Sequence, residues 1–79
     1  MIADLGYAEA QYELGKCYES GIGTDKNEKL AFICYQKATE QGCVKALYSL
    51  ANCAEKGIGT DKNDELALAW YQTAIEKDI

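Results

Sequence analysis

The sequence contains no histidine, and none of its four cysteines forms a Cys-x-x-Cys pair. A mixed cysteine–histidine zinc site is therefore excluded, and a cysteine or serine nucleophile would lack the histidine that commonly activates it. No other motif nominates an active site. We therefore expect no catalytic residue, no metal and no cofactor, and we predict that the chain is not an enzyme.

Two further absences narrow the range of partners. No apolar run approaches the roughly 20 residues that a bilayer-spanning helix needs, so we predict no membrane insertion. The first six residues have neither the basic start nor the apolar stretch of a secretory signal. The net charge of the 79 residues is −5, whereas nucleic-acid-binding modules carry a clustered basic patch, so nucleic acid is not expected as a partner.

The feature that organises the chain is an internal repeat. The heptapeptide Gly-Ile-Gly-Thr-Asp-Lys-Asn spans residues 21–27 and again residues 57–63, an offset of 36 residues. Laying residues 8–43 over residues 44–79 matches 18 of 36 positions. A fixed period of this length is typical of a stacked helical repeat. We predict one repeat at 8–43, a second at 44–79, and the tail of a truncated preceding repeat at 1–7.

The first half of each repeat predicts a helix, because apolar residues recur at spacings of three and four. In the first repeat this apolar face is expected to hold Tyr7, Ala10, Leu14, Cys17 and Tyr18. In the second repeat it is expected to hold Cys43, Ala46, Leu50, Cys53 and Ala54. We therefore predict that Leu14 and Leu50 are both core residues, and that truncating either to alanine costs about 2–5 kcal/mol.

The duplicated heptapeptide is interpreted as the turn between the two helices of each repeat. Gly21 and Gly57 follow the first helix, where glycine supplies the left-handed conformation that ends a helix. Asp25 and Asp61 are expected to cap the second helix, with Asn27 and its equivalent as rival caps. The second helices are densely apolar, which indicates packing on more than one side. The predicted fold class is all-α, with two helix-turn-helix repeats and four main helices.

The cysteines fit this scheme as core residues. Cys17 and Cys53 occupy equivalent repeat positions on the expected apolar faces, where cysteine behaves as a small hydrophobe. A disulfide such as Cys34–Cys43 stays open at this point. The pattern favours reduced thiols and an intracellular setting.

The combined motif resembles the Sel-one-like repeat (SLR) family, a relative of the tetratricopeptide repeat, over about nine-tenths of the chain. The first copy carries the motif as Ala10, Leu14-Gly15, Tyr18, Gly21, Gly23, Asp25, Ala31, Tyr35 and Ala38. The second copy carries it as Ala46, Leu50, Gly57, Gly59, Asp61, Ala67, Trp70-Tyr71 and Ala74. Three departures change packing volume: the family's glycine is Ala51, its tyrosine is Ala54, and its tryptophan is Cys34 in the first copy.

The resemblance implies an α-solenoid with a right-handed superhelix and a concave face lined by the first helix of each repeat. It also implies a protein–protein interaction module that acts as an adaptor or scaffold for a protein or peptide partner. The candidate partner-binding residues are Gln11, Tyr12, Glu13, Lys16, Leu47, Tyr48, Ser49 and Asn52. Tyr12 and Tyr48 could instead serve packing, which the family's use of this position favours, and Lys16 and Asn52 could together hold a peptide carboxylate.

An alternative function is a structural spacer or self-association module without a specific ligand. A solenoid normally needs about three repeats to complete its core. We therefore expect that the two repeats are a piece of a longer array, and that exposed repeat ends could form a homodimer.

Overall fold

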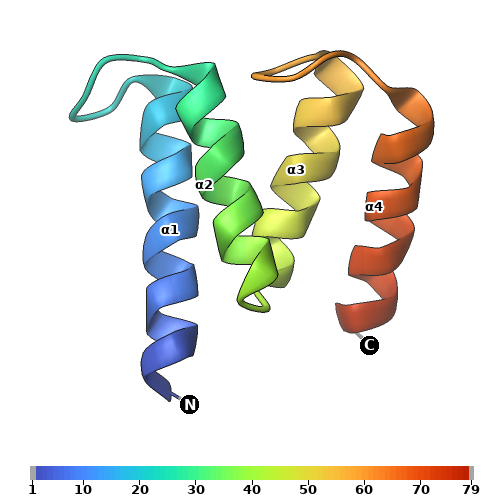
Figure 1. The fold of residues 1–79 in the computed structure, drawn as a ribbon, viewed down its shortest axis with the longest axis horizontal. Helices are drawn as coiled ribbons and strands as arrows, with labels where there is room; N and C mark the ends of the chain where they lie inside the picture. The colour runs from blue at the N-terminus through green and yellow to red at the C-terminus, as the bar shows by residue number, and fades with distance from the viewer. Residues whose placement is uncertain (1, 79) are drawn as a thin grey trace.

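The computed structural model describes the backbone of residues 2–78 and the side chains of residues 7–78. Four α-helices follow one another: α1 (Ile2–Ser20), α2 (Glu28–Glu40), α3 (Val44–Lys56) and α4 (Asp64–Asp78). They stand in a row with alternating direction, and each helix packs against the next (Figure 1). The described residues contain no strand, so the predicted all-α fold with four main helices is confirmed. None of the described helices is long and apolar enough to cross a membrane.

Helix α1 is longer than its counterpart α3 and runs unbroken through Gly6 and Tyr7. The equivalent residues before α3, Gln41 and Gly42 at the end of the first repeat, form a turn instead. The assignment of residues 1–7 to a preceding repeat stays a prediction. Met1 and Ile79, which belong to the expected tail and to the second repeat, lie outside the described residues.

Each heptapeptide forms the predicted turn. Its two glycines have positive φ, which is 73° at Gly21, 75° at Gly23, 74° at Gly57 and 71° at Gly59. The N–H of Gly57 donates to the carbonyl oxygen of Cys53 and so closes α3. Side chains with a Cβ rarely adopt this conformation, which explains why both turns use glycine. The prediction that the first glycine ends the helix is confirmed.

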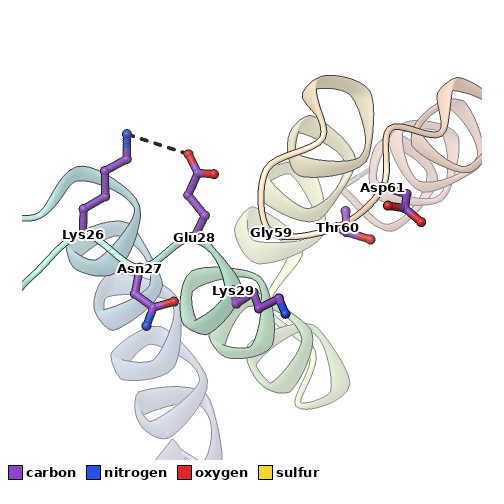
Figure 2. Close-up of a pocket in the computed structure, with 7 residues that line it drawn as sticks. All are labelled: Lys26, Asn27, Glu28, Lys29, Gly59, Thr60 and Asp61. Atoms are coloured by element: carbon purple, nitrogen blue, oxygen red, sulfur yellow. Dashed lines mark ion pairs between the residues drawn. The ribbon is translucent and has the colours of Figure 1, made fainter.

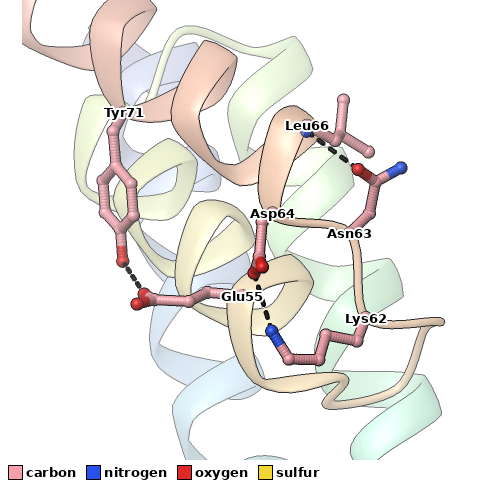
Figure 3. A network of polar contacts seen from close by, with 6 residues as sticks. All are labelled: Glu55, Lys62, Asn63, Asp64, Leu66 and Tyr71. Carbon is pink, nitrogen blue, oxygen red and sulfur yellow. Dashed lines mark hydrogen bonds and ion pairs between the residues drawn. The ribbon is translucent and has the colours of Figure 1, made fainter.

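An asparagine, rather than the expected aspartate, caps the second helix of each repeat. Asn27 Oδ1 accepts a hydrogen bond from the N–H of Leu30 at 3.1 Å. Asn63 Oδ1 accepts the equivalent bond from Leu66 at 3.0 Å (Figure 3). An N-cap side chain satisfies one of the backbone donors that the first helical turn leaves unpaired.

The prediction of Asp25 and Asp61 as caps is therefore wrong, and the reason lies in the backbone. The N–H of Asn27 donates to the carbonyl oxygen of Tyr18 in α1 at 2.8 Å, and the equivalent bond in the second repeat is 2.7 Å. This bond ties the last turn residue to the preceding helix. The helical conformation consequently begins one residue after the asparagine, too late for the aspartate to act as the cap.

The core consists mainly of small side chains. Its buried members include Ala31, Ala38, Ala46, Leu50, Cys53 and Ala74. Tyr35, which is 1 % exposed, is the largest fully buried side chain among the described residues. All four cysteines are free, so the Cys34–Cys43 disulfide that the sequence left open is not formed.

The two repeats differ in how well the first helix is covered. Leu50 in α3 is 3 % exposed, whereas the equivalent Leu14 in α1 is 43 % exposed. Ala46 is buried, while its equivalent Ala10 is exposed. The prediction that Leu14 is a core residue is therefore wrong. Helix α3 has α2 and α4 on its two sides, but α1 packs chiefly against α2 alone.

Candidate functional site

A shallow groove of about 430 Å³ lies on one face of the helix row. Its lining combines aromatic, hydroxyl, amide and amino groups from α1, α3 and α4: Tyr12, Lys45, Tyr48, Ser49, Asn52 and Tyr71. Four of the eight residues that the sequence nominated for partner binding therefore line one groove. These four are Tyr12, Tyr48, Ser49 and Asn52.

Helical periodicity explains why the α3 residues of the groove lie together. Lys45, Tyr48, Ser49 and Asn52 fall at positions i, i+3, i+4 and i+7, which places them on one face of α3. Among the hydrogen bonds of the described side chains, none involves the side chain of Ser49 or Asn52. Their donors and acceptors are therefore free for a bound molecule.

Tyrosine pairs repeat along the groove. The rings of Tyr12 and Tyr35 have centroids 6.0 Å apart, and those of Tyr48 and Tyr71 have centroids 6.3 Å apart, both tilted by 45°. Tilted aromatic pairs at this separation stabilise each other beyond the area that they bury. Both Tyr12 and Tyr48 therefore pack against a second-helix ring and also line the groove, while their role in partner binding stays a prediction.

The hydroxyl groups of the second-helix tyrosines are anchored by glutamates. Tyr35 donates to Glu19 Oε1 at 2.7 Å, and Tyr71 donates to Glu55 Oε1 at 3.1 Å (Figure 3). Burial raises the pKa of both tyrosine hydroxyls, and the hydrogen bond to the neighbouring carboxylate raises it further. Both hydroxyls therefore stay protonated and act as donors.

The two tyrosines differ in exposure, since Tyr35 is buried and Tyr71 is half-buried. A Cβ at Gly15 would lie 2.8 Å from the Tyr35 ring, so that ring takes the space beside the glycine. The second repeat has the buried Ala51 at this position. Helix α2 has α1 and α3 on its two sides, whereas α4 packs chiefly against α3, so Tyr71 is less buried than Tyr35, and it lines the groove.

Leu47 does not belong to the site. Its side chain is only 4 % exposed and lies in the core cluster, so the prediction of Leu47 as a partner-binding residue is wrong. It falls on the buried face of α3 with Leu50, Ala51 and Ala54, at the same i, i+3, i+4, i+7 spacing.

The remaining nominated residues, Gln11, Glu13 and Lys16, lie on α1 and do not line the groove. Gln11 Nε2 donates to the Tyr7 hydroxyl at 2.8 Å. Lys16 Nζ lies 3.9 Å from Glu13 Oε1 and 5.2 Å from the centroid of the Tyr12 ring. The lysine therefore sits over one aromatic wall of the groove and can move to a ligand without losing a buried partner.

Sequence reasoning missed two lining residues, Lys45 and Tyr71. Lys45 could have been found by continuing the helical spacing of Tyr48, Ser49 and Asn52 back by three positions. Its Nζ lies 3.9 Å from Glu9 Oε1, which links equivalent positions of the two repeats. Tyr71 gave no comparable signal, because its exposure depends on which helices lie beside α4.

A larger hollow, of about 740 Å³, lies at the seam between the repeats (Figure 2). It is lined by Lys26, Asn27, Glu28, Lys29, Gly59, Thr60 and Asp61. Lys26 Nζ lies 3.7 Å from Glu28 Oε2, and the asparagine is engaged as a helix cap. This hollow has no aromatic wall and its charges are mixed in sign. The tyrosine groove is therefore the better candidate for binding.

Comparisons with known proteins agree with this architecture. The Sel1 repeat family model matches residues 8–43 and 44–79. The crystal structure of a Sel1 repeat protein from Oxalobacter formigenes superposes with a TM-score of 0.85 at 39% sequence identity, over 91% of this chain and 54% of that chain.

Two curated relatives share part of the sequence. DAP3-binding cell death enhancer 1 from Rattus norvegicus and its counterpart from Mus musculus are each 38% identical over 42 residues. That stretch is 53% of this chain but only 8% of each relative. The similarity thus concerns one small part of a much longer protein.

Proposed function

Because this chain belongs to the Sel1 repeat family, we propose that it is a protein-binding module whose tyrosine groove receives a segment of another protein. Sel1 repeat proteins generally mediate protein–protein interactions, and the helical solenoid fold is typically non-catalytic. The module acts as an adaptor or scaffold through non-covalent recognition.

The observation that carries the proposal is the composition of the groove. Three tyrosines present rigid aromatic surface next to the free polar groups of Ser49 and Asn52. Tyrosine is enriched at energetically dominant interface positions, because it buries a large area and also offers a hydroxyl group. A shallow, open groove with this lining suits a peptide segment better than a small, enclosed ligand.

The charges beside the groove favour an acceptor-rich segment. Lys45 lines it and Lys16 sits over its Tyr12 wall, and both lysines are exposed. Their nearest carboxylates are 3.9 Å away, so the existing ion pairs are weak and easily exchanged. Lys16 and Asn52 occupy equivalent repeat positions, and we propose that they hold a carboxylate or main-chain carbonyl groups of the partner.

The names of the rodent relatives support a binding role in general terms, since they state that those proteins bind DAP3. The partner itself is not carried over, because the similarity covers 8% of each relative.

A peptide-display selection on the folded chain tests the proposal. Selected peptides should lose at least about tenfold in affinity for Tyr48→Ala, as expected for a central aromatic contact. Tyr7→Ala serves as the matched control, because it removes an exposed tyrosine outside the groove. Lys16→Glu should also weaken binding, while Lys37→Glu on α2 makes the same charge change away from the groove. Unchanged affinity of all selected peptides for Tyr48→Ala would exclude the groove as the site.

A further inference from the structure

Helix α1 carries an apolar face that has no neighbour among the described residues. Tyr7 and Leu14 lie on it and are largely exposed, whereas their equivalents in α3, Cys43 and Leu50, are buried. The α3 face is covered because it forms the seam with α2. The exposed face of α1 is therefore equivalent, residue by residue, to the face of α3 that α2 covers.

The opposite end of the row has the complementary open face. Leu68 and Ile75 on α4 are 59 % and 52 % exposed. Their equivalents on α2, Phe32 and Thr39, are both half-buried. The ring of Phe32 contributes to the seam, with its centroid 6.4 Å from that of Trp70. Helices α1 and α4 stand at the two ends of the row (Figure 1).

The turns show that the α1 end has room for another helix. At the internal seam, the backbone of Gly59 lies against the carbonyl group of Glu28 at the start of α2. The equivalent Gly23 has nothing within 4 Å of the position of a Cβ. The start of α4, at Asp64, is the equivalent of Glu28. At the α2–α3 seam, the start of α2 fills the space beside Gly59. The equivalent space beside Gly23 is open, and the start of α4 from another copy would occupy the same relative position.

We propose that these two faces bind each other between copies of this chain. The α4 face of one copy, with Leu68 and Ile75, covers the α1 face of the next copy, with Tyr7 and Leu14. The contact repeats the geometry of the internal α2–α3 seam, so it continues an interface that the fold already contains. A head-to-tail contact of this kind is heterologous, and it gives open-ended assemblies rather than a closed dimer.

A difference in charge between α4 and α2 should make the contact between copies weaker than the α2–α3 seam within the chain. Within the chain, Lys29 at the start of α2 and Asp61 in the second turn line the same hollow (Figure 2). The equivalent of Lys29 on α4 is Glu65, and the equivalent of Asp61 in the next copy is Asp25. The opposite charges that line the hollow at the seam thus become like charges between copies, and salt should strengthen the association by screening their repulsion.

Sedimentation velocity on the whole chain, from micromolar to millimolar concentration, tests the head-to-tail contact. Wild type should sediment faster with increasing concentration and pass beyond a dimer. Leu14→Lys and Leu68→Lys each destroy one face, so each variant alone should stay monomeric. Their circular dichroism spectra should match that of wild type, because both residues are exposed.

Mixing the two variants gives the decisive result. The intact α4 face of Leu14→Lys should bind the intact α1 face of Leu68→Lys and form a dimer that grows no further. A symmetric α1–α1 or α4–α4 contact instead predicts that one variant dimerises alone and that mixing adds nothing. Either that outcome or a wild type that stays monomeric throughout would overturn the head-to-tail contact.

A charge variant tests the register of the contact. Glu65→Lys should tighten the association roughly threefold to tenfold, because it restores the opposite charges of the seam. Glu40→Lys makes the same change in net charge on the exposed surface of α2 and is the matched control. Equal tightening by both variants would show that net charge alone acts, and would contradict the seam-like register.

Discussion

Gly59 lies so close to the carbonyl group of Glu28 that a methyl group at residue 59 would overlap the carbonyl oxygen. The equivalent Gly23 has the same positive φ but open space around it. A comparison of the two glycines therefore separates the effect of backbone strain from the effect of packing between repeats. In the first repeat the glycine only permits the positive φ, whereas in the second repeat it also allows the turn to approach α2.

Alanine at the two positions should differ in cost. Gly23→Ala should lower the free energy of unfolding by about 1 kcal/mol, the cost of a left-handed residue with a Cβ. Gly59→Ala should lower it by about 3 kcal/mol, because the seam between α2 and α3 must also open. Urea denaturation of both variants measures the difference. Equal losses would mean that the contact between Gly59 and Glu28 does not restrain the seam.

A second matched pair tests the uneven burial of the first helices. Leu50→Ala should destabilise the chain by about 2–5 kcal/mol, because it empties a buried site. Leu14→Ala should cost less than about 1 kcal/mol, because the residue is already 43 % exposed and its removal empties no closed cavity. The measurement is best made at low protein concentration, where the proposed contact between copies is dissociated. A Leu14→Ala loss as large as that of Leu50→Ala would contradict the open face on α1.

The helix caps give a third prediction. Asn27→Ala should destabilise by about 1 kcal/mol, since the first turn of α2 loses the acceptor for the N–H of Leu30. Asp25→Ala should change stability by less than about 0.5 kcal/mol, because the aspartate is an exposed turn residue. Thermal unfolding followed by circular dichroism distinguishes the two, and the reverse order would restore the aspartate as the cap.

A fourth prediction concerns alkaline pH. Burial raises the pKa of the Cys53 thiol from 9.0 to about 12, and the charges of Glu19 and Glu28 add to the effect. The unfolded chain therefore loses this proton at lower pH than the folded chain. The corresponding stability is fully present below pH 9.0 and is lost as the pH rises toward about 12.

Replacing the thiol should remove that pH dependence. Cys53→Ala should be less stable than wild type at neutral pH, because a buried group is truncated. Its unfolding free energy should nevertheless fall less steeply above pH 9.0, as measured by urea titration at a series of pH values. Identical slopes for the two proteins would show that Cys53 does not titrate differently in the folded and unfolded states.

The repeat period was enough to predict the fold, because every helix and turn recurs with the same chemistry. Gly21 and Gly57 ended their helices as expected. The exposure of Leu14 could not be read from its own repeat, because burial depends on which helix lies alongside. The choice between Asp25 and Asn27 as cap was equally invisible, since it is fixed by a backbone bond to Tyr18.

The groove was predictable in part. Tyr48, Ser49 and Asn52 share one helical face, and the same periodicity places Leu47 on the buried face. The prediction assigned residues of the first helix to the binding surface without separating these two faces. Tyr71 could not be predicted, because its exposure depends on which helices lie beside α4, and its own repeat carries no sign of that.

The most direct test of the proposed protein-binding role is a ¹H–¹⁵N correlation spectrum of the chain, titrated with a peptide from the display selection. The account predicts that the largest shift changes fall on the backbone amides of Tyr12, Lys45, Tyr48, Ser49 and Asn52, with Leu14 and Leu68 unaffected. Changes confined to the turns at residues 21–27 and 57–63, or to the outer faces of α1 and α4, would contradict it.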